Sequence, residues 1–125
     1  MPKVKPDEVQ WLDDVTGDDY SAARNYLLLI RTPSAVKQLI TALKAAPVTQ
    51  HKAVDLLRAS RVKLAKTNDP PCRKEIKKIK DGDAISPVLL VRDPAHGATI
   101  IADGYHRICA AFQVNPDVVV HCKIV

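Results

Sequence analysis

The stretch from Ile100 to Phe112 constrains the fold most, because it changes from a strand pattern to a helix pattern within two residues. Apolar residues over 98–102 predict a strand that ends at Asp103, and a helical pattern begins directly after Gly104. Glycine supplies the backbone freedom that such a turn needs, and it lets a ligand approach the backbone closely. We therefore expect a strand that feeds a helix through a sharp glycine corner.

This corner has the chemistry of an anion site. The free N–H groups in the first turn of a helix and the positive end of its dipole favour a bound anion. Arg107 offers a planar fork to a phosphate or a carboxylate, and His106 stands beside it. The alternative is a structural corner in which Asp103 caps the helix, while His106 and Arg107 are solvated.

Two further strands complete the C-terminal half. Residues 87–92, PVLLVR, form a continuous apolar run typical of a strand buried on both faces. Residues 93–97 predict a hairpin loop that leads into the strand before Gly104. A last strand is expected over 118–125, after a turn at Asn115-Pro116. Residues 85–125 therefore predict a β-hairpin, a helix and a strand.

The N-terminal half has mainly helical periodicity. We expect an extended arm over 1–17, docked by Trp11 and Leu12. Helical patterns follow at 20–30, 33–45, the later part of 48–60, and 72–80. The expected inward residues include Tyr26, Val54, Leu57 and Phe112. The fold class is α+β, with one domain over 1–125 that comprises the arm, a mainly helical part over 18–82 and the core over 85–125.

Composition excludes some classes of protein. With 125 residues the chain is long enough for one domain and too short for two ordinary ones. No apolar run approaches the roughly 20 residues of a membrane span, and the first residues lack the apolar centre of a signal peptide. Three cysteines at scattered positions show neither a disulfide framework nor zinc-site spacing. We expect a cytoplasmic protein with no membrane contact and no metal site.

The charge is unevenly distributed. Residues 31–80 contain thirteen Lys or Arg against three acids, whereas residues 1–19 contain six acids against two Lys. A basic middle segment favours an anionic partner, and the alternative is a lysine-rich solvated helix face. Lys52, Arg58, Arg61 and Lys63 are candidates to complete a phosphate cleft or a nucleic-acid track along 52–80. Aromatic residues are not interleaved there, which weakens a base-stacking model.

From Ile85 onward, the chain resembles the ParB/sulfiredoxin superfamily. The resemblance is carried by ISPVLLVR at 85–92 and by IIADGYHRICAA at 100–111, about forty residues in all. ParB-type N-terminal domains have G-E-R-R-x-x-A at the second position, sulfiredoxins have G-C-H-R-x-x-A, and free-serine kinases of this fold have D-G-H-x-R. The resemblance implies a small mixed sheet with a helical N-terminal half.

The resemblance also implies a nucleotide whose phosphates lie at the 104–107 turn. Gly104 matches the turn glycine, and His106 and Arg107 match the pair that holds phosphates. Tyr105, which lies within the same turn, is a further candidate to contact the ligand. It stands where sulfiredoxin has its catalytic cysteine, so sulfiredoxin chemistry is not expected. Asp103 matches the acid of the kinase-like variant and is a candidate to hold Mg²⁺ or act as a base. No helix-turn-helix domain follows, so ParB-type site-specific DNA binding is not expected.

These observations lead to three hypotheses about function, of which the first is preferred. The first is a domain that binds a nucleotide or other phosphate ligand at the DGYHR turn, with phosphotransferase or nucleotide hydrolase activity and a nucleoside triphosphate with Mg²⁺ as the candidate cofactor. Asp103 and His106 are its candidate catalytic residues. The second is a nucleic-acid-binding or ParB-like nuclease protein. The third is a non-catalytic protein-interaction module.

Overall fold

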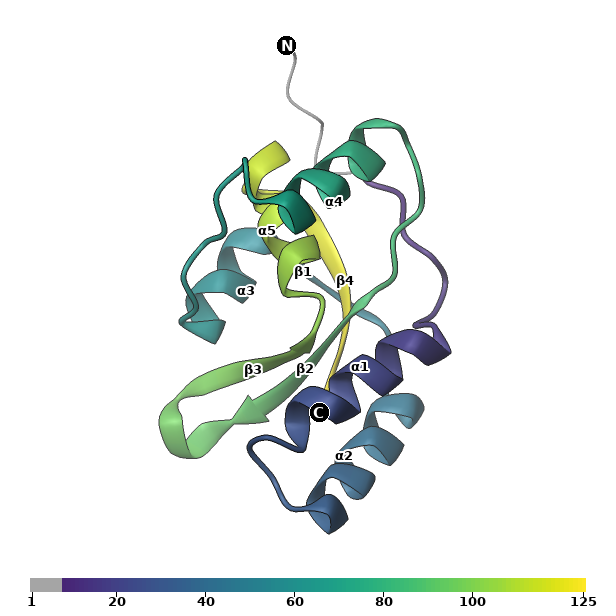
Figure 1. The fold of residues 1–125 in the computed structure, drawn as a ribbon, viewed down its shortest axis with the longest axis vertical. Coiled ribbons are helices and arrows are strands. Elements are labelled where there is room, and N and C mark those ends of the chain that lie inside the picture. Colours follow the sequence, from purple (N-terminus) through teal and green to yellow (C-terminus); the bar gives the residue numbers. More distant parts are fainter. Residues whose placement is uncertain (1–7) are drawn as a thin grey trace.

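Among the residues that the structure describes, four strands form one mixed sheet in the order β1-β4-β2-β3 (Figure 1). They are β1 (Thr49–Lys52), β2 (Val88–Asp93), β3 (Ala98–Asp103) and β4 (Val119–Ile124). β2 and β3 form the predicted antiparallel hairpin, β4 runs parallel to β2, and β1 pairs antiparallel with β4. The computed structural model describes residues 8–125, so the start of the predicted arm lies outside the described residues.

In the described part of the chain, residues 8–125, five α-helices accompany the sheet. They are α1 (Gly17–Leu27), α2 (Pro33–Ala45), α3 (Ala53–Ser60), α4 (Pro70–Lys80) and α5 (Tyr105–Val114), and a short 3₁₀ turn at Pro94–His96 lies in the hairpin. This element order confirms the predicted α+β class. Helix α1 begins earlier than predicted because Thr16 and Asp19 form a capping box, in which each side chain accepts from the other's backbone N–H. Within residues 8–125, no helix has the length and hydropathy needed to cross a membrane.

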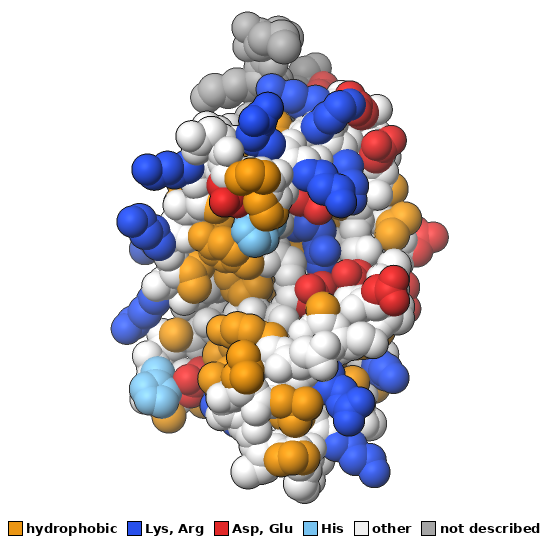
Figure 2. Space-filling view, in the orientation of Figure 1, with side chains coloured by type: hydrophobic (Ala, Val, Ile, Leu, Met, Phe, Trp, Pro, Cys, Tyr) orange, Lys and Arg blue, Asp and Glu red, His pale blue; other side chains and the backbone are white. Residues whose placement is uncertain are grey.

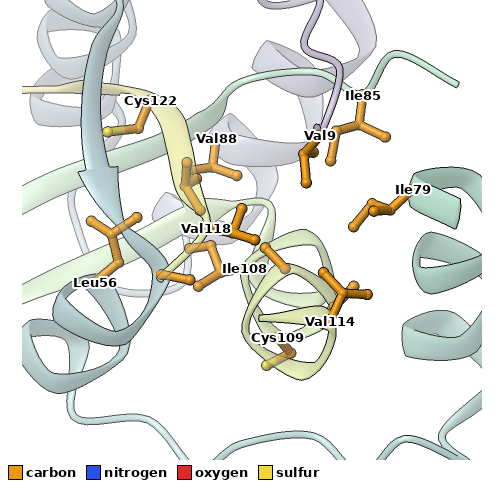
Figure 3. Close-up of a cluster of buried hydrophobic side chains, with 14 of the residues drawn as sticks. Val9, Leu56, Ile79, Ile85, Val88, Ile108, Cys109, Val114, Val118 and Cys122 are labelled. Atoms are coloured by element: carbon orange, nitrogen blue, oxygen red, sulfur yellow. The ribbon is translucent and has the colours of Figure 1, made fainter. Parts of the chain in front are cut away.

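The sheet carries a hydrophobic core on each face, and β2 contributes to both. Val88 and Leu90 belong to the core shared with α3, α4 and α5, whereas Leu89 and Val91 belong to the core shared with α1 and α2. This alternation explains why the apolar run is continuous. Figure 3 shows the first core, in which Val88 and Val118 of the sheet region meet Ile108 of α5.

Of the four residues expected to face inward, Tyr26 does not, and the other three are only partly buried. Helix α3 buries Ala53, Leu56 and Ser60, while Val54 and Leu57 are only partly buried. Tyr26 of α1 is exposed, and α1 ends at Leu27, so it buries only Ala23 and Leu27. Phe112 is partly buried against the first core. The sequence periodicity located these helices, but it misplaced α3's buried face by about one position.

The arm docks beside the strand segment that precedes β2. Trp11 forms an isolated parallel bridge with Ile85, and its ring stacks on His121 with centroids 5.2 Å apart. Val9 is buried, whereas Leu12 is exposed and contributes a backbone N–H···O bond of 2.9 Å to Ile85. The arm is thus docked at Trp11 and Leu12 as predicted, but Leu12 contributes its backbone, and the buried aliphatic side chain of the arm is that of Val9.

A buried lysine attaches the arm and the first helices to the sheet. Lys123 of β4 donates from Nζ to the Tyr20 hydroxyl at 3.0 Å and to the Lys44 carbonyl at 3.2 Å, and it lies 3.1 Å from an Asp14 carboxylate oxygen. Burial disfavours its charge, but the bonds to Tyr20 and Asp14 outweigh that effect and raise the pKa of Lys123. The ammonium group therefore stays charged and links three separate segments.

The β3–α5 corner depends on a close approach between Gly104 and β2. The strand register slips at this point, since Leu89 opposes Asp103 while Leu90 opposes Ile101, and such a bulge bends the end of β3. Gly104 has φ +102°, and a Cβ on it would lie 2.3 Å from Cγ1 of Val88. The expectation that glycine makes room for a ligand needs correction, because the side chain of Val88 fills that side.

Gly104→Ala is expected to lower the free energy of unfolding by about 3 kcal/mol, because it adds left-handed backbone strain to a clash with Val88. Urea unfolding followed by circular dichroism measures this loss. Gly17→Ala is the matched control, since a Cβ there meets no atom within 4 Å, and its change should stay within about 0.5 kcal/mol. Equal stability of the two variants would contradict the packing role of Gly104.

Candidate functional site

An open hollow of about 350 Å³ lies between the segment 61–69 and the first turn of α5. Its lining residues are Lys63, Leu64, Ala65, Lys66, Asn68, Asp69, Tyr105 and His106. Figure 2 shows hydrophobic side chains gathered around this part of the surface, with Lys and Arg side chains along the adjoining edge. Two residues of the DGYHR motif therefore face a concave site with basic groups on its opposite wall.

Three hydrogen bonds to α5 residues hold the segment 61–69 in place. The Tyr105 hydroxyl donates to the Lys63 carbonyl, Gln113 donates to the Ala65 carbonyl at 3.0 Å, and the Ala65 N–H donates to Cys109 Sγ at 3.5 Å. Burial first, and then Cys109, raise the pKa of Tyr105 to about 12. The phenol thus remains a neutral donor, and Cys109 is the buried core residue that its helix position predicts.

His106 forms an ion-pair contact with Asp69, with Nε2 3.4 Å from Oδ2. The contact lacks hydrogen-bond geometry, and Asp69 Oδ2 is buried without a hydrogen-bond donor among the described residues. Asp69 stands at the N-cap of α4 but makes no capping bond, and α4 starts with Pro70 and Pro71, which have no N–H. The carboxylate is thus directed to the histidine rather than to its own helix.

The start of α5 is not capped by a side chain. Gly104 is the N-cap residue, and the first intrahelical donor is the N–H of Ile108, 3.0 Å from the Gly104 carbonyl. The N–H groups of Tyr105, His106 and Arg107 precede it and so have no acceptor within the helix. The alternative in which Asp103 caps the helix is wrong, because that carboxylate pairs with Arg107 instead.

Arg107 is held between two carboxylates and does not line the hollow. Its Nη2 lies 2.8 Å from Asp103 Oδ2, and its Nη1 lies 3.6 Å from Asp19 Oδ1. Only 14% of its side chain is exposed. The two Nη groups of the fork expected to bind phosphate thus face protein carboxylates, and they join α1 to the β3–α5 corner, while Nε is buried without a hydrogen-bond acceptor among the described residues. No local pattern in the sequence indicates this pairing, because Asp19 and Arg107 are far apart in the chain.

The pKa values of Asp19 and Asp103 are shifted in opposite directions, although both carboxyl groups lie beside Arg107. Burial raises the pKa of Asp103 above its ordinary 3.8, although the charge of Arg107 opposes this rise. Burial acts in the same sense on Asp19, but a hydrogen bond with Ser86 and the charge of Arg107 outweigh it and lower the pKa of Asp19. Asp103 is therefore the carboxyl that takes a proton first, with Asp19 and Arg107 remaining charged.

The other basic candidates lie elsewhere. Lys52 contacts Asp117 at 3.9 Å beside the end of β4, and Arg58 contacts Asp55 at 3.9 Å on its own helix. Arg61 ends α3 with φ +53° and extends toward the hairpin glycine, Gly97. None of the three lines the hollow.

The basic residues that line the hollow are Lys63 and Lys66. Only Lys63 was among the candidates named from the sequence. Residues 67–71 have the pattern of a loop, and nothing in that pattern indicates that Asp69 lines a site. Residues 8–125 contain no group of three or more His, Cys, Asp or Glu placed to hold a metal ion.

No family model matches the chain, and comparisons with curated proteins and with solved structures also find no match. The ParB/sulfiredoxin resemblance thus depends on the motif residues alone.

Asp103→Asn tests the proton-sharing pair. Because the folded-state pKa of Asp103 lies above its ordinary 3.8, the unfolded chain releases this proton first, and the wild type loses stability as the pH rises through the raised pKa. The stability of the wild type relative to Asp103→Asn should therefore fall as the pH rises above about 4. Urea unfolding across this range measures it, and a flat or rising difference would contradict the assignment.

Proposed function

We propose that this protein is a ParB/sulfiredoxin-like domain that binds a phosphate-bearing small molecule in the hollow beside α5. The observation that carries the proposal is that Lys63, Lys66 and His106 line one hollow beside the uncapped start of that helix. Backbone N–H groups at a helix start and nearby ammonium groups are the donors that phosphates need. The motif resemblance supports a nucleotide as the ligand.

The roles of the motif residues follow from their contacts. Tyr105 holds the segment 61–69 through its hydroxyl, and His106 presents a ring nitrogen to the hollow wall. Arg107 and Asp103 fix the orientation of the first turn of α5 through their 2.8 Å contact. In this proposal Arg107 positions the anion site rather than binding the anion, and Asp103 takes part in the same support.

The proposal concerns binding, and any phosphoryl transfer or hydrolysis would use the same hollow. His106, beside Asp69, is the hollow's candidate for proton transfer, because the Tyr105 phenol stays neutral. The buried, unpaired state of Cys72, Cys109 and Cys122 supports a reducing compartment such as the cytoplasm.

A second candidate is binding of nucleic acid along α4. This helix exposes Arg73, Lys74, Lys77 and Lys80, and its N-cap residue, Asp69, lines the hollow. Such a row of cations favours a phosphate backbone in a salt-dependent manner. Lys77 is already paired with Asp81 at 2.7 Å, which reduces the charge available to a partner.

The double substitution Lys63→Ala and Lys66→Ala is expected to weaken binding of inorganic phosphate and nucleotides by at least roughly tenfold, since it removes two charge-assisted donors. Calorimetric titration at low salt measures the dissociation constants. The Tyr105 hydroxyl bonds the backbone of Lys63, so the substitutions leave that anchor intact.

Lys52→Ala is the control for overall charge, because Lys52 lies outside the hollow. It should change affinity by less than about twofold. The proposal fails if neither phosphate nor any nucleotide binds the wild type, or if the control weakens binding as much as the double variant. Oligonucleotide binding that Arg73→Ala with Lys74→Ala abolishes would favour the second candidate.

A further inference from the structure

The turn between α1 and α2 carries a cluster of exposed apolar side chains. Among the residues that the structure describes, six large hydrophobic residues are exposed, and four of them lie within 26–30. These four, which we call the apolar tip, are Tyr26, Leu28, Leu29 and Ile30, and Leu29 is 81% exposed. Exposed apolar residues that are scattered singly are ordinary, whereas a cluster of them marks a contact with a partner.

The backbone of the apolar tip is already fixed in the free protein. The N–H groups of Leu28, Leu29 and Ile30 each donate to a carbonyl group of the last turn of α1, at 3.0 Å in every case. On either side of the tip, Leu27 and Val36 are buried in the core that α1 and α2 share with the sheet. The tip therefore projects from a rigid support, and little conformational entropy is lost when a partner binds it.

Basic side chains without acidic neighbours in the sequence flank the apolar tip. Residues 20–54 contain no Asp or Glu, and Arg24, Arg31 and Lys37 lie within about two helical turns of the tip along the chain. In the described part of the chain, none of these three cations forms an ion pair. Asp93, in the hairpin before the strand on which α1 packs, is already paired with a histidine at 2.8 Å. The partner that fits is therefore anionic at its surface and apolar beneath it.

The shape of the apolar tip distinguishes between partners of this kind. Successive residues of a helical turn point about 100° apart, so Leu28, Leu29 and Ile30 face different sides. A protein groove receives a single apolar stripe, whereas the interface of a bilayer surrounds a projecting apolar group on all sides. A second copy of the chain fits poorly, because the same cations would face each other across a two-fold interface. The tip lies toward the end of the molecule opposite α4, where Figure 2 shows hydrophobic side chains with Lys and Arg beside them (Figures 1 and 2).

We propose that the apolar tip docks this protein on the surface of an anionic lipid bilayer. Its aliphatic side chains enter the boundary between headgroups and acyl chains, and Arg24, Arg31 and Lys37 contact the anionic headgroups. The contact is peripheral, since no helix within residues 8–125 could span a bilayer. It differs from the expectation of no membrane contact, which considered only spanning runs and a signal peptide. The inference is separate from the proposed function, because none of these residues lines the hollow.

Co-sedimentation with vesicles tests this inference. One set of vesicles contains equal parts of phosphatidylcholine and phosphatidylserine, and the other contains phosphatidylcholine alone. At about 0.1 M salt the wild type should bind the anionic vesicles at least roughly tenfold more tightly than the neutral ones. Leu29→Ser with Ile30→Ser should weaken binding to the anionic vesicles at least roughly tenfold, because two apolar side chains no longer enter the bilayer. Arg31→Gln with Lys37→Gln should weaken it by a similar factor.

Each pair of substitutions has a matched control. Val62→Ser replaces an exposed apolar residue outside the tip, and Lys74→Gln with Lys80→Gln removes two exposed cations from α4, at the other end of the molecule (Figure 1). These controls should change the affinity for anionic vesicles by less than about twofold. Circular dichroism verifies that every variant is folded.

The inference is overturned if the wild type binds no anionic vesicles, if the tip variants bind them as tightly as the wild type, or if the controls weaken binding equally. Sedimentation velocity then identifies the other partners. Self-association that Leu29→Ser with Ile30→Ser abolishes, without vesicle binding, would assign the tip to a second copy. A monomer that binds no vesicles would leave an acidic protein surface as its partner, and in both cases the inference is wrong.

Discussion

The paired contacts of Arg107 are the constraint on which the rest of the structure depends. One guanidinium contacts Asp103 at the end of β3 and Asp19 in the first turn of α1, so it joins the N-terminal helices to the strand–helix corner. All three side chains are mostly buried, and an arginine in such a position needs its carboxylates, because the loss of either leaves an uncompensated charge. The orientation of α5, and hence of the hollow, follows from this link.

Neighbouring residues of the DGYHR motif at the β3–α5 corner have different roles. Gly104 allows α5 to pack against Val88, and Arg107 faces the protein interior. Tyr105 and His106 instead face the segment 61–69. A motif that resembles a continuous phosphate-binding sequence is thus divided between a structural half and a half that lines the hollow. Both halves of the motif belong to the first turn of α5, whose backbone N–H groups are not capped by a side chain.

Local patterns in the sequence were sufficient for most of the fold. The continuous apolar run at β2 predicted a strand buried on both faces, and both cores confirm it. The helical pattern predicted over 33–45 matches α2, which begins at Pro33 after the Thr32 hydroxyl accepts from the N–H of Ala35. Such features depend on residues close together in sequence, and their physical causes are turns, caps and periodicity.

The site was less accessible from sequence because it depends on pairs that are distant in the chain. Asp19 and Arg107 are separated by most of the domain, and nothing local identifies the carboxylate that occupies the arginine. Asp69 read as a loop residue before a helix, and only the packing of α4 against α5 brings it to His106. Lys52 was a reasonable candidate by charge alone, but β1 directs it to Asp117.

The most direct test of the central claim is a titration of the ¹⁵N-labelled protein with adenosine 5′-monophosphate, followed residue by residue through its amide resonances. We predict saturable shifts at Tyr105, His106 and the segment 63–69, whose groups line the hollow, and unshifted resonances at Lys52 and at the hairpin pair Asp93 and His96. Shifts confined to other surfaces, or no shifts at the start of α5, would contradict an anion site in the hollow.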